Sequence, residues 1–268
     1  FNNITGAKQH VGNYAGVTVE KKEGHANFNG RDLLFIDLPG TYSLTARSLD
    51  ELVARNVIVN DNPDVIVNVL DASNLERNLY LAAQLLELEK PMVIALNMSD
   101  VAEEMGIKYD FKKMAELTGA TIVSTVGRTN IGTKELLEAT ISVAASQKAP
   151  GVTVNYGDLL EGKIAELVAA LEEAGTVTYP LRWIAIKLLE NDPDVVEKVK
   201  GFANTEAVLQ KAAAIREEIK DQVDLDIVFQ EYRHRYAVEV YNQSLTQAPK
   251  EIETRSDRYD KILTHRIW

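Results

Sequence analysis

Two polar side chains, Asn97 and Asp100, follow an apolar run at a spacing that suits recognition of a purine base. The Asp100 carboxylate can accept hydrogen bonds from the N1–H and the exocyclic amino group of guanine, a donor pair that adenine lacks. Asn97 would brace the neighbouring loops and the base, and the flexible stem of Met98, which stands where a lysine is more usual, can cover the purine face. Taken alone, the motif is more simply a strand-end turn that contains an Asn and an Asp.

The stretch from Asp37 to Gly40 has the residue types that bind a metal ion and a phosphate. The Asp37 carboxylate would hold a water molecule on Mg²⁺, and the Gly40 amide would approach a γ-phosphate, where a Cβ would obstruct. Upstream, Thr18 could supply a hydroxyl ligand to Mg²⁺, and the later segment Ser124 to Val126 could point an amide at guanine O6. Each motif has an ordinary alternative as a turn, a strand or a loop. Their order, each at the end of a predicted strand, favours a guanine-nucleotide site.

Alternating strands and helices must position these residues. The sequence predicts buried strands at 64–70, 91–96 and 120–124, a hairpin of 17–28 and 32–37 around Asn29-Gly30, and helices at 48–60, 75–89, 110–119 and 133–145. Ser48 with Glu51 forms a capping box, Asp110 can cap a helix, and Gly119 can end it. This alternation predicts an α/β, doubly wound sheet with ligands at the carboxyl ends of its strands.

The pattern becomes helical after Pro150-Gly151. Apolar residues recur at helical spacing over 159–171, 181–189, 195–202, 205–221 and 225–242. We therefore predict a nucleotide-binding domain over 1–149, an all-helical domain over 150–254 and a separate tail over 255–268.

Composition narrows the function classes. Acidic residues outnumber basic ones 40 to 29, which argues against a nucleic-acid duplex as partner because such a partner needs a basic face. There is no cysteine, so disulfides and thiolate-held metal sites are excluded. The sequence contains no apolar run long enough to span a membrane and no signal-peptide pattern, so we expect an intracellular fragment.

One element of a nucleotide site is missing from the sequence. No G-x-x-x-x-G-K-[ST] phosphate loop occurs, so we expect the nucleotide-binding domain to be incomplete at its N-terminus.

Three stretches resemble the ferrous iron transport protein B (FeoB) family of bacteria. Residues 11–20 and 37–44 resemble its switch segments, and 260–268 resembles the segment just before its first membrane span. The resemblance covers the whole chain. It implies a P-loop GTPase-like G domain that binds GTP, followed by a helical domain that leads to an Fe²⁺-transporting membrane region.

The resemblance also implies roles for individual residues. Thr18 would bind Mg²⁺ directly and Asp37 through water, with GTP or GDP as the bound nucleotide. The phosphate loop would lie before Phe1, with an asparagine associated with activation by K⁺. The implied nucleotide-binding residues are Gly16, Val17, Thr18, Val19, Glu20, Asp37, Leu38, Pro39, Gly40, Asn97, Met98, Asp100, Ser124, Thr125 and Val126.

Slow hydrolysis is expected, because Thr41 stands where small GTPases carry a water-orienting glutamine, and no catalytic residue is assigned. The implied partners are guanine nucleotide and the C-terminal membrane domain of the same polypeptide. A homo-oligomer is compatible with this assignment, and we expect no nucleic-acid partner. The expected location is the cytoplasmic face of the inner membrane. Trp268 with Lys261 and Arg266 would anchor the juxtamembrane tail 255–268, whose alternative is a plain basic C-terminus.

Two other functions stay open. A soluble regulatory GTPase acting on ribosome or tRNA would share the fold, and a chain without a phosphate loop could serve as a nucleotide-free binding module.

Overall fold

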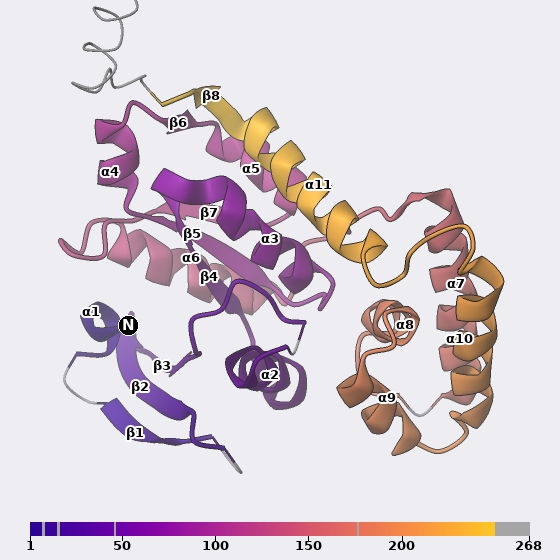
Figure 1. The fold of residues 1–268 in the computed structure, drawn as a ribbon. Helices are drawn as coiled ribbons and strands as arrows, with labels where there is room; N and C mark the ends of the chain where they lie inside the picture. The colour runs from indigo at the N-terminus through magenta and orange to yellow at the C-terminus, as the bar shows by residue number, and fades with distance from the viewer. Residues whose placement is uncertain (7–8, 15–16, 46, 176, 250–268) are drawn as a thin grey trace, which may run out of the picture.

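A three-stranded parallel sheet lies at the centre of the first half of the molecule (Figure 1). The structure is a computed structural model that describes residues 1–6, 9–14, 17–45, 47–175 and 177–249. The strands, in the order β4-β5-β7, are β4 (Ile66–Asp71), β5 (Met92–Asn97) and β7 (Thr121–Ser124). All three were predicted to within two residues. Asp71 pairs with Asn97 in the register, and Leu96 with Ser124, so the strands end together at one edge.

Both faces of the central strand β5 are covered, whereas Val69 of the neighbouring strand β4 is 59% exposed. Ile94 and Leu96 of β5 belong to the large apolar core on one face, whereas Val93 and Ala95 pack with Leu136 on the other. The helices of this region are α3 (Leu75–Leu86), α5 (Phe111–Thr118) and α6 (Thr133–Ser146), together with α4 (Ser99–Glu104), which was not predicted. A parallel sheet needs such cover because its strands are apolar on both sides. The α/β prediction is confirmed.

The first strands form a separate antiparallel sheet, β1-β2-β3. Its members are β1 (Gln9–Asn13), β2 (Glu20–Phe28) and β3 (Arg31–Asp37). The predicted turn is confirmed, since Asn29 and Gly30 both have positive φ, at 52° and 77°. The predicted start of the hairpin at residue 17 is wrong, because Val17 and Thr18 lie in a bend and β2 begins at Glu20. The strand β1 was not predicted.

Helix ends follow their chemistry. Helix α2 (Leu49–Asn56) begins at Ser48, whose hydroxyl accepts a hydrogen bond from the Glu51 amide at 3.2 Å. Glu51 itself reaches back to the amide of Arg47 at 2.9 Å, one residue before the cap. The chain continues as a π-helical segment (Val57–Asp61), and α5 begins at Asp110 and ends at Gly119 as predicted.

Five helices follow in the described part of the second half. They are α7 (Gly157–Ala174), α8 (Leu181–Leu189), α9 (Pro193–Lys200), α10 (Glu206–Ile219) and α11 (Val228–Ser244). All five were predicted, with ends that differ by no more than a few residues. Seven consecutive residues of α8, 183–189, are buried, so this helix is enclosed by the others.

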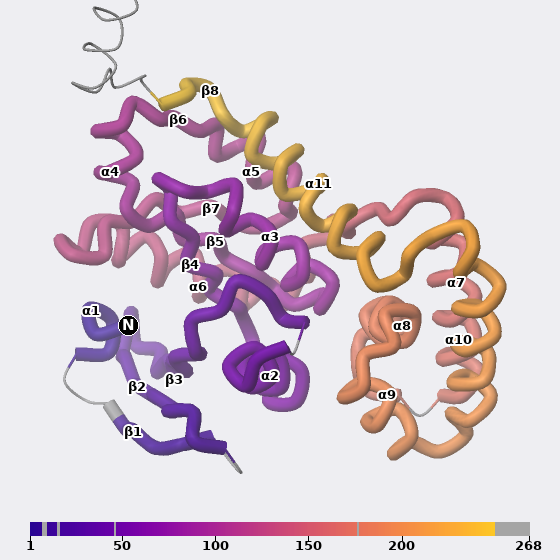
Figure 2. The backbone as a smooth tube through the Cα atoms, in the orientation of Figure 1, coloured from indigo at the N-terminus to yellow at the C-terminus, as the bar shows by residue number. Residues whose placement is uncertain are grey.

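The last helix returns to the first half of the chain. Figure 2 shows α11 running from the helical bundle back along α5 and α3. The Arg233 guanidinium of α11 is buried and binds Glu87, which follows α3, with Nε to Oε1 at 2.6 Å. A short strand β8 (Leu245–Gln247) then pairs with β6 (Lys108–Tyr109), and neither strand was predicted. The boundary at 149/150 stays a prediction, and the tail over 255–268 lies outside the described residues. None of the helices that the structure describes has the length and the apolar character of a membrane span.

Candidate functional site

The carboxyl ends of β5 and β7 carry the residues predicted to hold the base. Asn97 is the last residue of β5, and its Oδ1 accepts a hydrogen bond from the Gly127 amide at 2.8 Å. The same oxygen lies 3.4 Å from the Thr125 hydroxyl. Asn97 therefore braces the loop that follows β7, as its place in the sequence suggested.

Main-chain bonds join the two loops further. The Thr125 amide donates to the Leu96 carbonyl at 2.8 Å, and the Ser99 hydroxyl donates to the Thr125 carbonyl at 3.0 Å. Beyond them, the Val126 amide donates to the Ile131 carbonyl at 2.9 Å and closes a short loop. Hydrogen bonds within the protein therefore hold the loop after β5 against the loop after β7.

A glycine allows the closed loop to pack tightly. Gly132 has φ +78°, and a Cβ at this position would lie 2.0 Å from the Ser124 carbonyl oxygen. Only a residue without a side chain fits both the backbone conformation and the contact.

Asp100 lies in the first turn of α4, directly after Met98 and Ser99. Met98 has φ 58° and is 40% exposed, so its side chain is free to cover a ligand. The Asp100 carboxylate forms an ion pair with Arg128, with Oδ2 to Nη2 at 2.7 Å and to Nε at 3.3 Å. The hydrogen bond from Arg128 holds the pKa of Asp100 below its usual value. Arg128 was not predicted as a partner of Asp100, because a single arginine in a loop forms no recognisable sequence pattern.

The predicted switch residues lie at the ends of β2 and β3. Lys22 pairs with Asp37 in the register, so the segment before β2 lies near the end of β3. Thr18, the expected Mg²⁺ ligand, is exposed. Val17 and Val19 pack against the cluster around Tyr14 and have a structural role. Gly16 lies outside the described residues.

Tyr14 ties the first switch segment to the second. Its ring is buried against Val53 and Val57, and its hydroxyl donates to the Asp37 carbonyl at 3.1 Å. Burial, followed by the nearby charge of Asp37, raises the pKa of Tyr14 to about 12. Sequence reasoning missed this residue, since nothing in the sequence marks its long-range partner.

The second switch segment leaves β3 at Asp37. Leu38 packs beside the same apolar cluster, whereas Gly40 is exposed and a Cβ there would meet open space. The Thr41 hydroxyl donates to the Ser43 carbonyl at 2.5 Å and accepts from the Ser43 amide at 3.1 Å. Thr41 therefore serves the local turn rather than an exposed catalytic position.

The oxygen atoms of Thr18 and Asp37 suit a small hard cation. Magnesium prefers such ligands and keeps several water molecules or phosphate oxygens in its shell. Among the described residues, no group of three or more His, Cys, Asp or Glu could hold a metal ion by itself. If Thr18 and Asp37 held Mg²⁺, they would supply only part of its shell, and phosphate or water would have to supply the rest.

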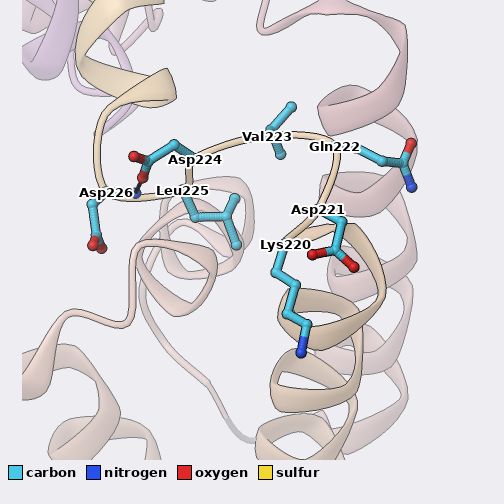
Figure 3. Close-up of a pocket in the computed structure, with 7 residues that line it drawn as sticks. All are labelled: Lys220, Asp221, Gln222, Val223, Asp224, Leu225 and Asp226. Atoms are coloured by element: carbon cyan, nitrogen blue, oxygen red, sulfur yellow. Dashed lines mark hydrogen bonds between the residues drawn. The ribbon is translucent and has the colours of Figure 1, made fainter.

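A surface hollow lies elsewhere, on the loop between α10 and α11. Figure 3 shows that the side chains of Lys220 to Asp226 around it point in different directions. The lining comes from a single stretch of loop, so no set of groups from different elements converges there.

Comparison with known proteins identifies the family. Residues 1–140 match the family profile "Ferrous iron transport protein B", and residues 156–246 match "FeoB cytosolic helical domain". This chain belongs to the FeoB family. The resemblance drawn from residues 11–20 and 37–44 is confirmed.

Several FeoB relatives match over nearly the whole chain. The Fe(2+) transport protein A/Fe(2+) transporter FeoB fusion protein of Porphyromonas gingivalis is 37% identical, covering 100% of this chain and 33% of that protein. The Fe(2+) transporter FeoB of Staphylococcus aureus is also 37% identical, over 99% of this chain and 40% of its own length. The chain therefore spans a third to two-fifths of the length of these transporters.

Solved FeoB structures confirm the fold. A mutant of S. thermophilus NFeoB bound to GDP aligns with a TM-score of 0.84 at 32% identity, covering 92% of this chain and 93% of that one. The cytosolic domain of the T. maritima FeoB iron transporter in a GDP form aligns at 0.80 with 29% identity, covering 92% of each chain. The predicted GTPase-like α/β sheet followed by a helical domain is the FeoB arrangement.

Proposed function

We propose that this chain is the guanine-nucleotide-binding, slowly GTP-hydrolysing cytosolic part of a ferrous iron transporter at the bacterial inner membrane, and that it regulates transport. The observation that carries this proposal is the joined edge of β5 and β7, where Asn97 braces the loops and Asp100 lies beside them. The proposal is supported by relatives named as Fe(2+) transporters and by FeoB structures named as GDP and GMPPNP forms.

Base selection would rest on Asp100. Guanine offers N1–H and an amino group to one carboxylate, and adenine leaves that carboxylate unpaired, at a free-energy cost that discriminates strongly. Met98 would cover the purine face, and Asn97 would fix the loop from Ser124 to Val126 beside the base.

Phosphate sensing would rest on the ends of β2 and β3. Thr18 and Asp37 would hold Mg²⁺, which neutralises phosphate charge when it is bound, and the Gly40 amide would meet the γ-phosphate. Loss of that phosphate would release both segments, a change from order to disorder that is common in GTPases. Because Thr41 is held in its own turn, we infer that no side chain at this position orients water, and that hydrolysis is slow.

Nucleotide binding is tested by titrating fluorescent GDP into this chain and into the same chain preceded by a phosphate-loop segment from a relative. We expect micromolar or tighter binding by the longer chain and weak binding by the shorter one, because phosphate contacts supply much of the affinity. Failure of the longer chain to bind GDP would overturn the proposal.

Base selection is tested in the longer chain with Asp100→Asn. The variant should lose about 100-fold in GDP affinity and gain affinity for xanthosine diphosphate, because a charged hydrogen-bonding partner is lost and a complementary one appears. Glu103→Gln, an exposed carboxylate on the same helix, is the matched control and should bind GDP as the unaltered chain does. Unchanged base preference in Asp100→Asn would remove Asp100 from the site.

A further inference from the structure

Arg128 covers the carboxylate to which the proposed function assigns the guanine base. Its guanidinium donates from both Nη2 and Nε to the same oxygen of Asp100, at 2.7 and 3.3 Å. Guanine would approach this carboxylate with two N–H donors of its own. One of these donors would be directed at Oδ2, the oxygen that Arg128 already holds.

The backbone of Arg128 is held in place while its side chain is free to move. The preceding residue, Gly127, donates its amide to Asn97, and Thr129 donates its amide to the Val126 carbonyl at 3.1 Å. The Arg128 side chain is 74% exposed, against 25% for Asp100. Because the backbone on either side of Arg128 is hydrogen-bonded and the side chain is exposed to solvent, the guanidinium can change rotamer without disturbing the loop.

Arg128 supplies a positive charge that residue 98 does not. The usual lysine of the base motif is replaced by Met98, which brings no charge beside Asp100. In the described part of the chain, Arg128 is the cation that pairs with Asp100, and it comes from the loop after β7. The charge near the base site is thus carried by the second loop.

We propose that Arg128 is a displaceable cap on the base-recognition carboxylate, and that guanine nucleotide enters only after the Arg128–Asp100 pair opens. This inference rests on the proposed function. An exposed ion pair contributes little free energy, so the cap slows entry of the base modestly, by about twofold to fivefold, and does not block it.

Stopped-flow mixing of fluorescent GDP with the chain carrying a phosphate loop tests the cap. Arg128→Gln keeps a polar side chain but shortens it and removes the charge, so the association rate constant should rise by about twofold to fivefold with the dissociation rate constant unchanged. Arg31→Gln, an exposed arginine at the start of β3, is the matched control and should leave both constants unchanged. An unchanged or lower association rate constant in Arg128→Gln, or faster dissociation, would overturn the cap.

A double-mutant cycle isolates the pair. In an Asp100→Asn background, measured with fluorescent xanthosine diphosphate, Arg128→Gln should no longer change the association rate constant, because the ion pair is already gone. A persistent effect would show that Arg128 acts elsewhere and would refute the inference. If Arg128→Gln binds GDP normally with unchanged kinetics, the cap is wrong and the proposed function stands. If the chain carrying a phosphate loop does not bind GDP at all, both are wrong.

Discussion

The two halves of the candidate site are built differently. We call the loops after β5 and β7 the base edge, and the segments around Thr18 and Gly40 the switch edge. The base edge follows a strand, β5, whose residues Val93, Ile94 and Leu96 are 0% exposed, and its two loops are joined to each other by hydrogen bonds. The switch edge ends a separate antiparallel sheet, and its key residues Thr18 and Gly40 are exposed. Telling guanine from adenine requires donors and acceptors in fixed positions, whereas sensing a γ-phosphate requires segments that can rearrange.

The switch edge is nevertheless anchored at a few points. Tyr14 binds the carbonyl of Asp37, and the buried Gln84 of α3 accepts a hydrogen bond from the Leu44 amide at 2.7 Å. Downstream, Arg55 of α2 is fully buried and forms ion pairs with Asp192 and Asp194. Asp192 caps α9 of the helical region, and Asp194 lies in its first turn. The switch segments therefore lie between anchors, one of which belongs to the helical region. The contrast between the edges predicts which substitutions disturb which half.

Loss of the Arg55 anchor should have the largest effect on stability. Arg55→Ala leaves Asp192, which is 7% exposed, without its buried cation, and we expect the free energy of unfolding in urea to fall by about 3–5 kcal/mol. Hydrogen exchange should rise in 20–56 and stay unchanged in 92–132, because the second range has its own hydrogen bonds.

Arg47→Ala is the matched control for the Arg55 anchor. Arg47 is exposed just before α2, so its removal should change the free energy of unfolding by less than about 0.5 kcal/mol. Equal exchange in both ranges after Arg55→Ala would contradict the view that the two edges are independent.

A pair of glycines compares the two edges directly. Gly132→Ala places a Cβ 2.0 Å from the Ser124 carbonyl oxygen at φ +78°, so we expect a loss of about 2–4 kcal/mol in unfolding free energy. Gly40→Ala meets open space at a φ that alanine tolerates, and its free energy of unfolding should change by less than about 0.5 kcal/mol. Thermal or urea unfolding measures both.

Although Gly40→Ala should leave the free energy of unfolding nearly unchanged, we expect it to alter nucleotide binding. If its amide meets the γ-phosphate, Gly40→Ala should weaken binding of a GTP analogue more than binding of GDP while the fold stays intact. Equal weakening of both nucleotides would detach Gly40 from phosphate sensing.

The same contrast explains what the sequence could predict. The strands β5 and β7 were found because each is a short, mostly apolar run, and the ends of α5 were found because Asp110 and Gly119 are recognisable helix-capping residues. Arg128 and Tyr14 were missed because their partners lie 28 and 23 residues away, and only the folded chain brings those partners close. The polar strand β1 was missed for a similar reason, since its order comes from pairing with β2.

Tyr14→Phe tests the weakest anchor of the switch edge. The substitution keeps the ring against Val53 and Val57 but removes the hydrogen bond to the Asp37 carbonyl, so the free energy of unfolding should fall by about 1 kcal/mol. Tyr109→Phe removes a comparable bond, at 2.8 Å to the Ala72 carbonyl, and serves as a control away from the switch edge. Only Tyr14→Phe should raise hydrogen exchange in the segment around Thr18.

The difference between the unaltered chain and Tyr14→Phe should depend on pH. The pKa of Tyr14 is about 12 in the folded chain against 10.0 for a free phenol, so the unfolded chain loses this proton first as pH rises. The stability that Tyr14 contributes is therefore complete below pH 10 and is lost as pH approaches 12. Urea unfolding at pH 9 and pH 11 should show the advantage over Tyr14→Phe shrinking. An advantage that stays constant over this range would mean that the phenol is not held as its burial and its hydrogen bond to the Asp37 carbonyl imply, and the switch edge would then lack this anchor.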